Sequence, residues 1–227
     1  MPATAEAKKL EFIATPEKGA VSALFQRPAE PSALLVLGHG AGSTLAHPLM
    51  DQLSQALHAA GIATLRYNYP YSERGRGMDT EPVRLATVAA AVELGRGLGA
   101  GLPLFAGGHS MSGRMTSMAC TRAPLAELLG IVFFAFPLHS GPPETARARH
   151  LSELSLPMLF LSGSRDKLAN AELLTGVVAE LPSATLELVE GADHSFKVPK
   201  RQAGALAVPA HLAQRTRAWM DRVSQRR

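Results

Sequence analysis

Two serines lie two positions apart in the glycine-rich stretch GGHSMSG, residues 107–113, which follows a short apolar run. A nucleophile on a sharp turn between a strand and a helix needs small residues two positions before it and two positions after it. Around Ser110 these positions hold Gly108 and Ser112, whereas around Ser112 one of them holds the long side chain of Arg114. The spacing predicts Ser110 as the nucleophile. The alternative interpretation is a serine that only caps a helix.

A serine hydroxyl becomes an effective nucleophile when a base accepts its proton and a carboxylate orients that base. His194 follows the last apolar run, in VEGADHSF, and Asp166 follows an earlier one, in LFLSGSRD. The chain order Ser110, Asp166, His194 is the order expected for nucleophile, acid and base on a sheet of alternating strands and helices. Asp193 is a competing acid, but it directly precedes His194 and is poorly placed to align the ring.

An acyl-transfer site also needs hydrogen-bond donors for the oxyanion that develops on the substrate. One candidate is the backbone amide of Met111, directly after the nucleophile. The second should come from the loop LGHGAGSTLAHP, in which Gly40 and its neighbours allow a tight turn, and we take Gly40 as a candidate substrate contact. The alternative is a phosphate-binding glycine loop. However, Ser43 replaces the third glycine of the dinucleotide fingerprint, and no helical pattern follows at once.

The elements that must position these residues are read from the alternation of apolar runs and helical patterns. Strands are expected over 9–15, 20–26, 32–38, 62–69, 103–108, 130–136, 156–163 and 184–191, and helices over 49–61, 82–98, 111–123, 170–181 and 210–223. Continuously apolar strands are typical of a parallel sheet that is covered on both faces. We predict one α/β domain over 1–227 with a mostly parallel sheet of about eight strands, edged by two antiparallel opening strands. Ligand sites form at the carboxyl ends of such strands, where each polar motif lies.

Composition and charge argue against several classes of function. The formal net charge of the 227 residues is +4, but the basic residues are scattered and accompanied by only three tyrosines and one tryptophan, so we do not expect nucleic-acid binding. The single cysteine, Cys120, excludes an internal disulfide and fits a reducing compartment. The N-terminus lacks the apolar stretch of a signal peptide, and no run approaches membrane-spanning length. A cytoplasmic protein without membrane contact is expected.

The histidines show no spacing typical of metal ligands, so we expect no metal and no cofactor. His39 and His109 adjoin glycines in the two site loops, and we interpret them as packing groups or as supports for the catalytic residues rather than as ligands. The tyrosine group YNYPY, residues 67–71, is interpreted equally as one wall of a pocket or as an ordinary packed loop.

The chain resembles α/β hydrolases of the small dienelactone-hydrolase-like group, which includes the testis-expressed and NSL-complex subunit hydrolase-like proteins. The matching stretches are LGHGAGSTLAHPLM, LRYNYPYSERGRG, GGHSMSGRM, FAFPLHSGPPE, LFLSGSRD and GADHSFKVPKR. The resemblance implies a catalytic triad of Ser110, Asp166 and His194, with the amides of Ala41 and Met111 as oxyanion donors. Relatives often have glycine where this chain has Ser112, whose hydroxyl could face the pocket. Dienelactone hydrolases proper use a cysteine nucleophile, so their substrate is not carried over.

We expect the site to be open to solvent, and this openness to influence which substrates it accepts. Where larger hydrolases insert a lid, this chain has only the stretch PLHSGPPETARARH, so we expect no lid domain and small or accessible substrates. Arg74, Arg76 and Arg149 lie in loops that should overlook the pocket, and at least one is expected to bind an anionic group of the substrate.

We therefore expect a serine hydrolase of carboxylesterase or thioesterase type, acting on a small-molecule ester or thioester. The alternative is a catalytically silent binding protein or complex subunit on the same fold.

Overall fold

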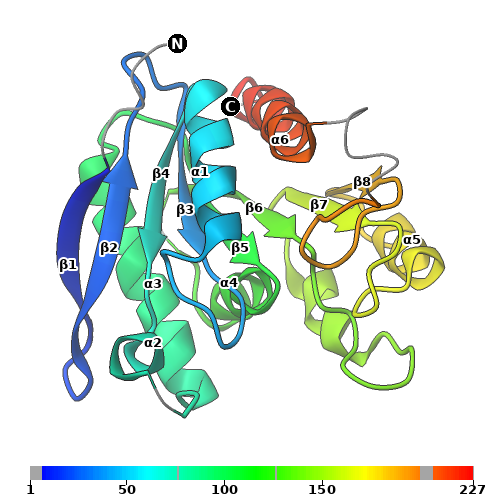
Figure 1. The fold of residues 1–227 in the computed structure, drawn as a ribbon, viewed down its shortest axis with the longest axis horizontal. Coiled ribbons are helices and arrows are strands. Elements are labelled where there is room, and N and C mark those ends of the chain that lie inside the picture. The colour runs from blue at the N-terminus through cyan, green and yellow to red at the C-terminus, as the bar shows by residue number, and fades with distance from the viewer. Residues whose placement is uncertain (1–6, 76, 126, 200–206, 227) are drawn as a thin grey trace.

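A computed structural model describes residues 7–75, 77–125, 127–199 and 207–226 (Figure 1). Its strands are β1 (Lys8–Thr15), β2 (Gly19–Gln26), β3 (Ala33–Gly38), β4 (Ile62–Tyr67), β5 (Leu104–His109), β6 (Leu128–Phe134), β7 (Met158–Gly163) and β8 (Ala184–Val189). Its helices are α1 (Pro48–Ala59), α2 (Pro70–Arg74), α3 (Glu81–Leu98), α4 (Met111–Arg122), the 3-10 helix η1 (Ala146–Glu153), α5 (Ala171–Ala179) and α6 (Val208–Ser224).

The eight strands form one sheet in the order β1-β2-β4-β3-β5-β6-β7-β8. β2 pairs antiparallel with β1 and with β4, and the remaining pairs are parallel. This confirms the predicted α/β class, the mostly parallel sheet and its antiparallel edge. Since β3, β5, β6, β7 and β8 are parallel neighbours, the loops that follow them meet at one edge of the sheet.

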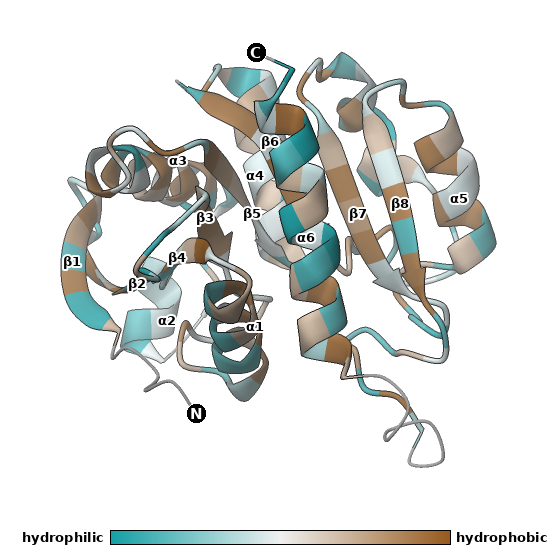
Figure 2. Cartoon of the chain, turned by 90° about the horizontal axis from the view of Figure 1, so that it is seen from above, coloured by the Kyte–Doolittle hydropathy of each residue, from teal (hydrophilic) through white to brown (hydrophobic). Residues whose placement is uncertain are grey.

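Helices cover both faces of the sheet, with α1 and α6 on one face and α3 and α4 on the other (Figure 1). The alternation of side chains along each strand divides the apolar core accordingly. In β3, Leu35 and Leu37 pack with α1 and α6, whereas Leu34 and Val36 pack on the α3 and α4 side. Both sets are buried, so the central strands are apolar on both faces, and β7 is hydrophobic along its length in Figure 2.

Two short helices were not predicted from the sequence. α2 follows Tyr69 and ends the expected strand 62–69 two residues early, because Pro70 starts a helix and cannot donate to a strand ladder. η1 lies in the β6–β7 connection and is too short to show a clear helical period. The expected strand 130–136 instead begins at Leu128 and ends at Phe134.

The β6–β7 connection, residues 135–157, is where a lid would be inserted. It contains η1 and no further helix or strand, so the predicted lack of a lid is confirmed. Among the helices of the described residues, none combines the length and the apolar character needed to cross a bilayer.

Candidate active site

Ser110 lies on the turn between β5 and α4 in a backbone conformation that non-glycine residues rarely adopt, with φ 52° and ψ −113°. Its amide donates to the carbonyl of Phe134 at 2.8 Å, which fixes the turn against β6. A Cβ at Gly108, where φ is +154°, would lie 2.3 Å from the carbonyl oxygen of Gly38. The sequence pattern predicted a small residue two positions before the serine, and the structure leaves room there for glycine alone.

The hydroxyl of Ser110 is at one end of a chain of two hydrogen bonds. Ser110 Oγ lies 2.9 Å from His194 Nε2, and His194 Nδ1 lies 2.8 Å from Asp166 Oδ2. Because Nδ1–H donates to the carboxylate, Nε2 carries the lone pair that accepts the hydroxyl proton of Ser110. The three residues come from the loops after β5, β7 and β8, which the parallel sheet brings to one edge.

The carboxylate of Asp166 is held on both oxygens. Its side chain is fully buried, and the oxygen that does not bind His194 accepts the amide of Leu168 at 2.8 Å. The competing acid, Asp193, instead accepts the backbone amides of Ser195 and Lys197 through Oδ1, each at 2.9 Å. Asp193 therefore shapes the loop that carries His194, and Asp166 is the acid that contacts the ring.

Two backbone segments lie next to Ser110. Met111 is the first residue of α4, so its amide lacks a partner within the helix and lies at the positive end of the helix dipole. The loop after β3 closes in a turn in which the amide of Ser43 donates to the carbonyl of Gly40 at 3.3 Å, with Gly42 at φ +66°. A Cβ at Gly40 would lie 3.6 Å from the Cβ of Ser110, and both residues line the same cavity, so this loop lies beside the serine.

His109 supports the site from within the turn. Its Nε2–H donates to the backbone carbonyl of His194 at 2.9 Å, and the centroids of the two rings are 5.1 Å apart. Burial lowers the pKa of His109 to about 4, so the ring is neutral near pH 7 and holds the His194 loop without adding a charge. A Cβ at Gly40 would come within 2.8 Å of His109 Nδ1, so the ring also requires glycine there.

Ser112 is fully buried and does not face the cavity. Its hydroxyl donates to the backbone carbonyl of His39 and accepts from the hydroxyl of Tyr69 at 2.9 Å. The ring of His39 packs edge to face against Tyr69, with centroids 5.3 Å apart, and its Nε2 is 2.9 Å from the hydroxyl of Ser72. Ser112 is thus a hydrogen-bonded link between α4 and the loop after β3.

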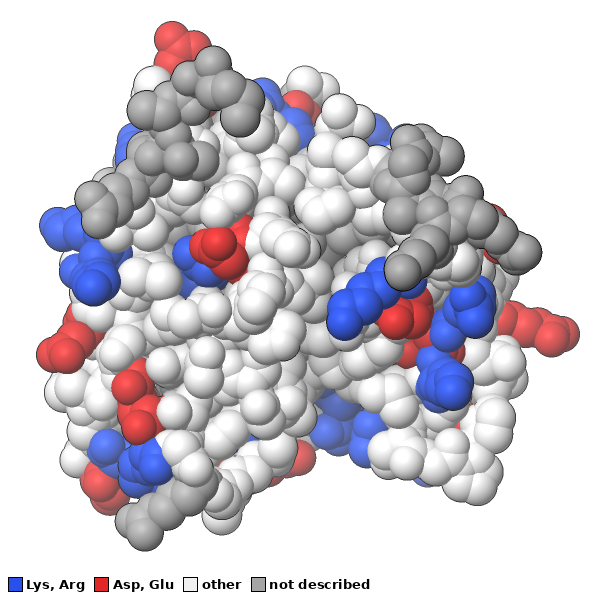
Figure 3. Space-filling view, in the orientation of Figure 1, with Lys and Arg blue, Asp and Glu red and all other residues white. Residues whose placement is uncertain are grey.

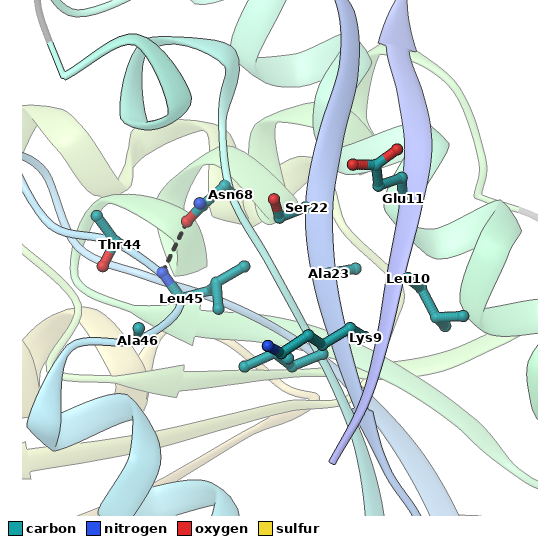
Figure 4. A pocket seen from close by; sticks show the side chains of 10 residues that line it. Lys9, Leu10, Glu11, Ser22, Ala23, Thr44, Leu45, Ala46 and Asn68 are labelled. Atoms are coloured by element: carbon teal, nitrogen blue, oxygen red, sulfur yellow. Dashed lines mark hydrogen bonds between the residues drawn. The ribbon is translucent and has the colours of Figure 1, made fainter.

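A cavity of about 340 Å³ opens over Ser110. Its lining includes Gly40 and Ala41 from the loop after β3, Met50 from α1, Leu168 and His194. A larger cavity of about 760 Å³ lies beside β1 and β2, where the amide of Leu45 donates to Asn68 Oδ1 (Figure 4). Neither Ser110, Asp166 nor His194 lines that larger cavity, so the smaller one is the candidate active site.

Of the arginines expected to bind substrate, the two that the structure describes, Arg74 and Arg149, do not line this cavity. Arg74 pairs with the buried carboxylate of Asp79 at 2.7 Å, and Arg149 is exposed on η1. Arg76 lies outside the described residues. The residues that sequence reasoning missed are instead Leu168, His47 and a group of cations beside His194, all of which share loops with predicted site residues. Leu168 and the cations follow the same strands as Asp166 and His194, and His47 follows the same strand as Gly40, so strand-end position could have indicated them.

Metal ligation and thiol chemistry have little support among the described residues. No group of three or more His, Cys, Asp or Glu side chains in the described ranges is arranged to hold a metal ion. Cys120 is buried in α4, and burial raises the pKa of its thiol to about 12, so the thiolate is scarce near pH 7.

Comparisons with solved structures agree with this architecture. An α/β serine hydrolase homologue from Coxiella burnetii is 18% identical, with a TM-score of 0.73 over 95% of this chain and 99% of that one. A serine hydrolase without a lid from Xanthomonas campestris is 17% identical, with a TM-score of 0.67 over 98% and 95% of the two chains. A dienelactone hydrolase from Anabaena variabilis is 16% identical, with a TM-score of 0.71 over 96% and 98%. These likenesses concern the fold.

Sequence comparison gives the family. No curated protein sequence matches the chain significantly. A family profile described as the alpha/beta hydrolase domain matches residues 31–221, which extend from just before β3 into α6 and include Ser110, Asp166 and His194. The chain therefore belongs to the alpha/beta hydrolase domain family.

Proposed function

We propose that this protein is a serine hydrolase that cleaves a small ester or thioester through an acyl-enzyme, with Ser110, His194 and Asp166 as its catalytic residues. The observation that carries the proposal is the continuous hydrogen-bonded chain from Ser110 Oγ through His194 to Asp166, with distances of 2.9 and 2.8 Å, on a strained turn. A protein that only binds a ligand has no need of a base and an acid in contact with a serine in a rare conformation.

In the first half-reaction, Ser110 Oγ attacks the carbonyl carbon while its proton passes to His194 Nε2. The tetrahedral intermediate collapses, the bond from carbon to the leaving oxygen or sulfur breaks, and the leaving atom takes the proton from Nε2. Asp166 stays ionised, keeps the proton on Nδ1 and stabilises the imidazolium that forms.

In the second half-reaction, water replaces the leaving group. His194 Nε2 accepts a proton from the water as its oxygen attacks the acyl carbon, and the bond from that carbon to Ser110 Oγ breaks. Ser110 Oγ then recovers the proton from Nε2, so the products are one carboxylic acid and a regenerated enzyme.

In both tetrahedral intermediates the oxyanion is bound by the amides of Met111 and Ala41 in this proposal. The start of α4 directly after Ser110 and the position of Gly40 and Ala41 in the cavity that Ser110 lines support the assignment. The sequence motifs further support a place in the small dienelactone-hydrolase-like group, beside the testis-expressed and NSL-complex subunit hydrolase-like proteins. The small, lidless cavity supports short or accessible acyl groups.

The test is intact-mass measurement after reaction with a fluorophosphonate probe, on the wild type, Ser110→Ala and Ser112→Ala. We expect one adduct on the wild type and on Ser112→Ala, and none on Ser110→Ala. Loss of the adduct in Ser112→Ala alone would assign the nucleophile to Ser112 instead. No adduct on any of the three proteins would overturn the proposal in favour of a binding protein or complex subunit.

A further inference from the structure

A second groove, of about 480 Å³, adjoins the candidate active site on the side of His194. Its lining includes the catalytic His194 and Ser195, together with three cations, Arg165, Lys167 and Lys197. Arg165 and Lys167 flank Asp166 in the loop after β7, and Lys197 follows His194 in the loop after β8. The two loops that supply the acid and the base therefore also supply a cationic groove.

These cations have no carboxylate partner among the described residues. Elsewhere on the described surface, Arg74, Arg122 and Arg217 each pair with an acidic side chain. The one acid that lines the groove is Asp193, and its Oδ1 already accepts two backbone amides. Lys and Arg side chains gather over the β7 and β8 side of the molecule in Figure 3, with acidic ones between them. Three cations against one carboxylate leave the groove with an excess of positive charge.

The reaction geometry relates this groove to one half of the substrate. His194 Nε2 must deliver a proton to the leaving oxygen or sulfur, so that atom has to lie within hydrogen-bond distance of His194. In the proposed reaction the carbonyl oxygen of the substrate points away from His194, toward the Met111 amide and the Gly40 loop. The alcohol or thiol part of the substrate therefore departs past His194, where the groove begins, and the acyl part does not.

From this arrangement we infer that the physiological substrate carries an anionic group, a carboxylate or a phosphate, on its leaving alcohol or thiol, and that Arg165, Lys167 and Lys197 bind it. The inference rests on the proposed hydrolase function and names the substrate class of the same site. It differs from an anion site at Arg74 or Arg149, neither of which lines either cavity. Arginine and lysine suit both anions, since both offer charged donors to their oxygens.

The experiment compares acetyl esters whose leaving groups differ in charge. The substrates are 4-acetoxybenzoate, 4-acetoxyphenyl phosphate and neutral 4-acetoxybenzamide, with the mono-4-nitrophenyl ester of succinic acid placing the charge on the acyl side. We expect kcat/KM for at least one anionic leaving group to exceed that for the amide by about tenfold at low salt. The preference should shrink between about 20 mM and about 500 mM salt, because exposed charges are screened. The carboxylate and phosphate arms distinguish the two anions.

Variants assign the effect to residues. The ratio of kcat/KM for anionic over neutral leaving groups is measured in Lys167→Gln, Lys197→Gln and Lys197→Glu. We expect the glutamines to lower the ratio by about threefold each, and the glutamate to lower it further, since each exposed charge contributes modestly. Arg226→Gln is the matched control, because it removes one positive charge at the far end of α6 and should leave the ratio unchanged.

The outcomes separate this inference from the proposed function. Suppose that the protein hydrolyses esters and is labelled by the probe. A kcat/KM ratio of anionic over neutral leaving groups near one, a preference for charge on the acyl side, or a ratio that the variants do not change would then overturn the inference alone. If no ester is hydrolysed and the fluorophosphonate probe forms no adduct, calorimetric binding of 4-hydroxybenzoate and 4-hydroxyphenyl phosphate decides. Binding of either by the wild type that is lost in Lys197→Glu would keep the anion site while the hydrolase proposal fails. Absence of binding would overturn both.

Discussion

The hydroxyl of Ser112 joins the turn that holds Ser110 to the loop that follows β3. Ser112 donates to the carbonyl of His39, next to Gly40, and accepts from the hydroxyl of Tyr69. Burial raises the pKa of Tyr69 to about 12, so that hydroxyl keeps its proton near pH 7 and remains a donor. Ser112 therefore fixes the start of α4 against the Gly40 loop.

We expect Ser112→Ala to lower the free energy of unfolding by about 1–3 kcal/mol, because the His39 carbonyl and the Tyr69 hydroxyl lose a buried partner together. Tyr69→Phe should lose about 1 kcal/mol, since Ser112 then keeps its bond to His39. Urea unfolding of the two variants and the wild type measures the difference. An equal loss in both variants would mean that the His39 contact contributes nothing.

A buried histidine makes stability depend on pH. Burial is the main cause that lowers the pKa of His39 from 6.5 to about 4. In the unfolded chain the ring binds a proton near its ordinary pKa, so the unfolded state is protonated first as pH falls. The contribution of neutral His39 to the free energy of unfolding is fully present above pH 6.5. It decreases toward pH 4, by on the order of 3 kcal/mol.

The check is urea unfolding of the wild type and His39→Gln at about pH 7.5 and about pH 4.5. Carboxylates titrate in both proteins, so the difference between the two pH dependences isolates His39. The wild type should lose more stability on acidification than His39→Gln. Equal losses would show that this ring does not titrate below its ordinary pKa. The variant itself is expected to be less stable at both pH values.

At the scale of elements, α3 approaches the sheet closely because of one glycine. A Cβ at Gly95 would lie 2.5 Å from Val36 Cγ2 in the buried strand β3, whereas a Cβ at the exposed Gly97 would meet no atom within 4 Å. Val36 is β-branched and packed in the core, so it cannot turn aside. The two glycines share a helix and differ in what lies opposite them.

We expect Gly95→Ala to destabilise the protein by about 1–3 kcal/mol through overpacking. Gly97→Ala should stabilise it by about 0.5–1 kcal/mol, because alanine has the higher helix propensity. Denaturant unfolding of both variants measures opposite signs for the same substitution two residues apart. A stable Gly95→Ala protein would mean that α3 can shift away from β3 at little cost.

At the scale of the whole molecule, the parallel sheet with its short β6–β7 connection leaves the candidate site open. Loops after β3, β5, β7 and β8 surround Ser110, and η1, the helix within residues 135–157, does not line the cavity over them. A hydrolase without a lid has no closed state for a lipid surface to open. Its activity should therefore depend on the dissolved substrate alone.

We expect 4-nitrophenyl acetate and butyrate to be hydrolysed with hyperbolic kinetics, and the rate to fall as the acyl chain outgrows the cavity of about 340 Å³. No increase in rate should appear when a longer ester forms micelles. A jump in rate at the critical micelle concentration would indicate a covering segment, and Ser110→Ala measured in parallel removes any background hydrolysis.

Most strands and helices of this protein, and the residues of its candidate site, could be predicted from local sequence patterns. Short, continuous apolar runs between turn signals favour strands buried on both faces, so the sheet and its helices could be predicted, and the short turn between the opening strands indicated the antiparallel edge. The small residues around Ser110 indicated the serine, and strand-end positions indicated Asp166 and His194. In the structure Ser110 Oγ lies 2.9 Å from His194 Nε2, and His194 Nδ1 lies 2.8 Å from Asp166 Oδ2. α2 and η1 escaped because one or two turns show no clear period.

Tertiary structure decided which distant side chains share a surface. Arg74, chosen for its place after a strand, pairs with Asp79, and the side chain of Ser112 turns into a buried network instead of the cavity. Lys197 joins Arg165 and Lys167 beside His194 only because β7 and β8 are neighbours. Spacing along the chain assigns residues to a strand end. Whether a side chain there meets a cavity, a carboxylate or solvent depends on the pairing of strands, which sequence spacing does not specify.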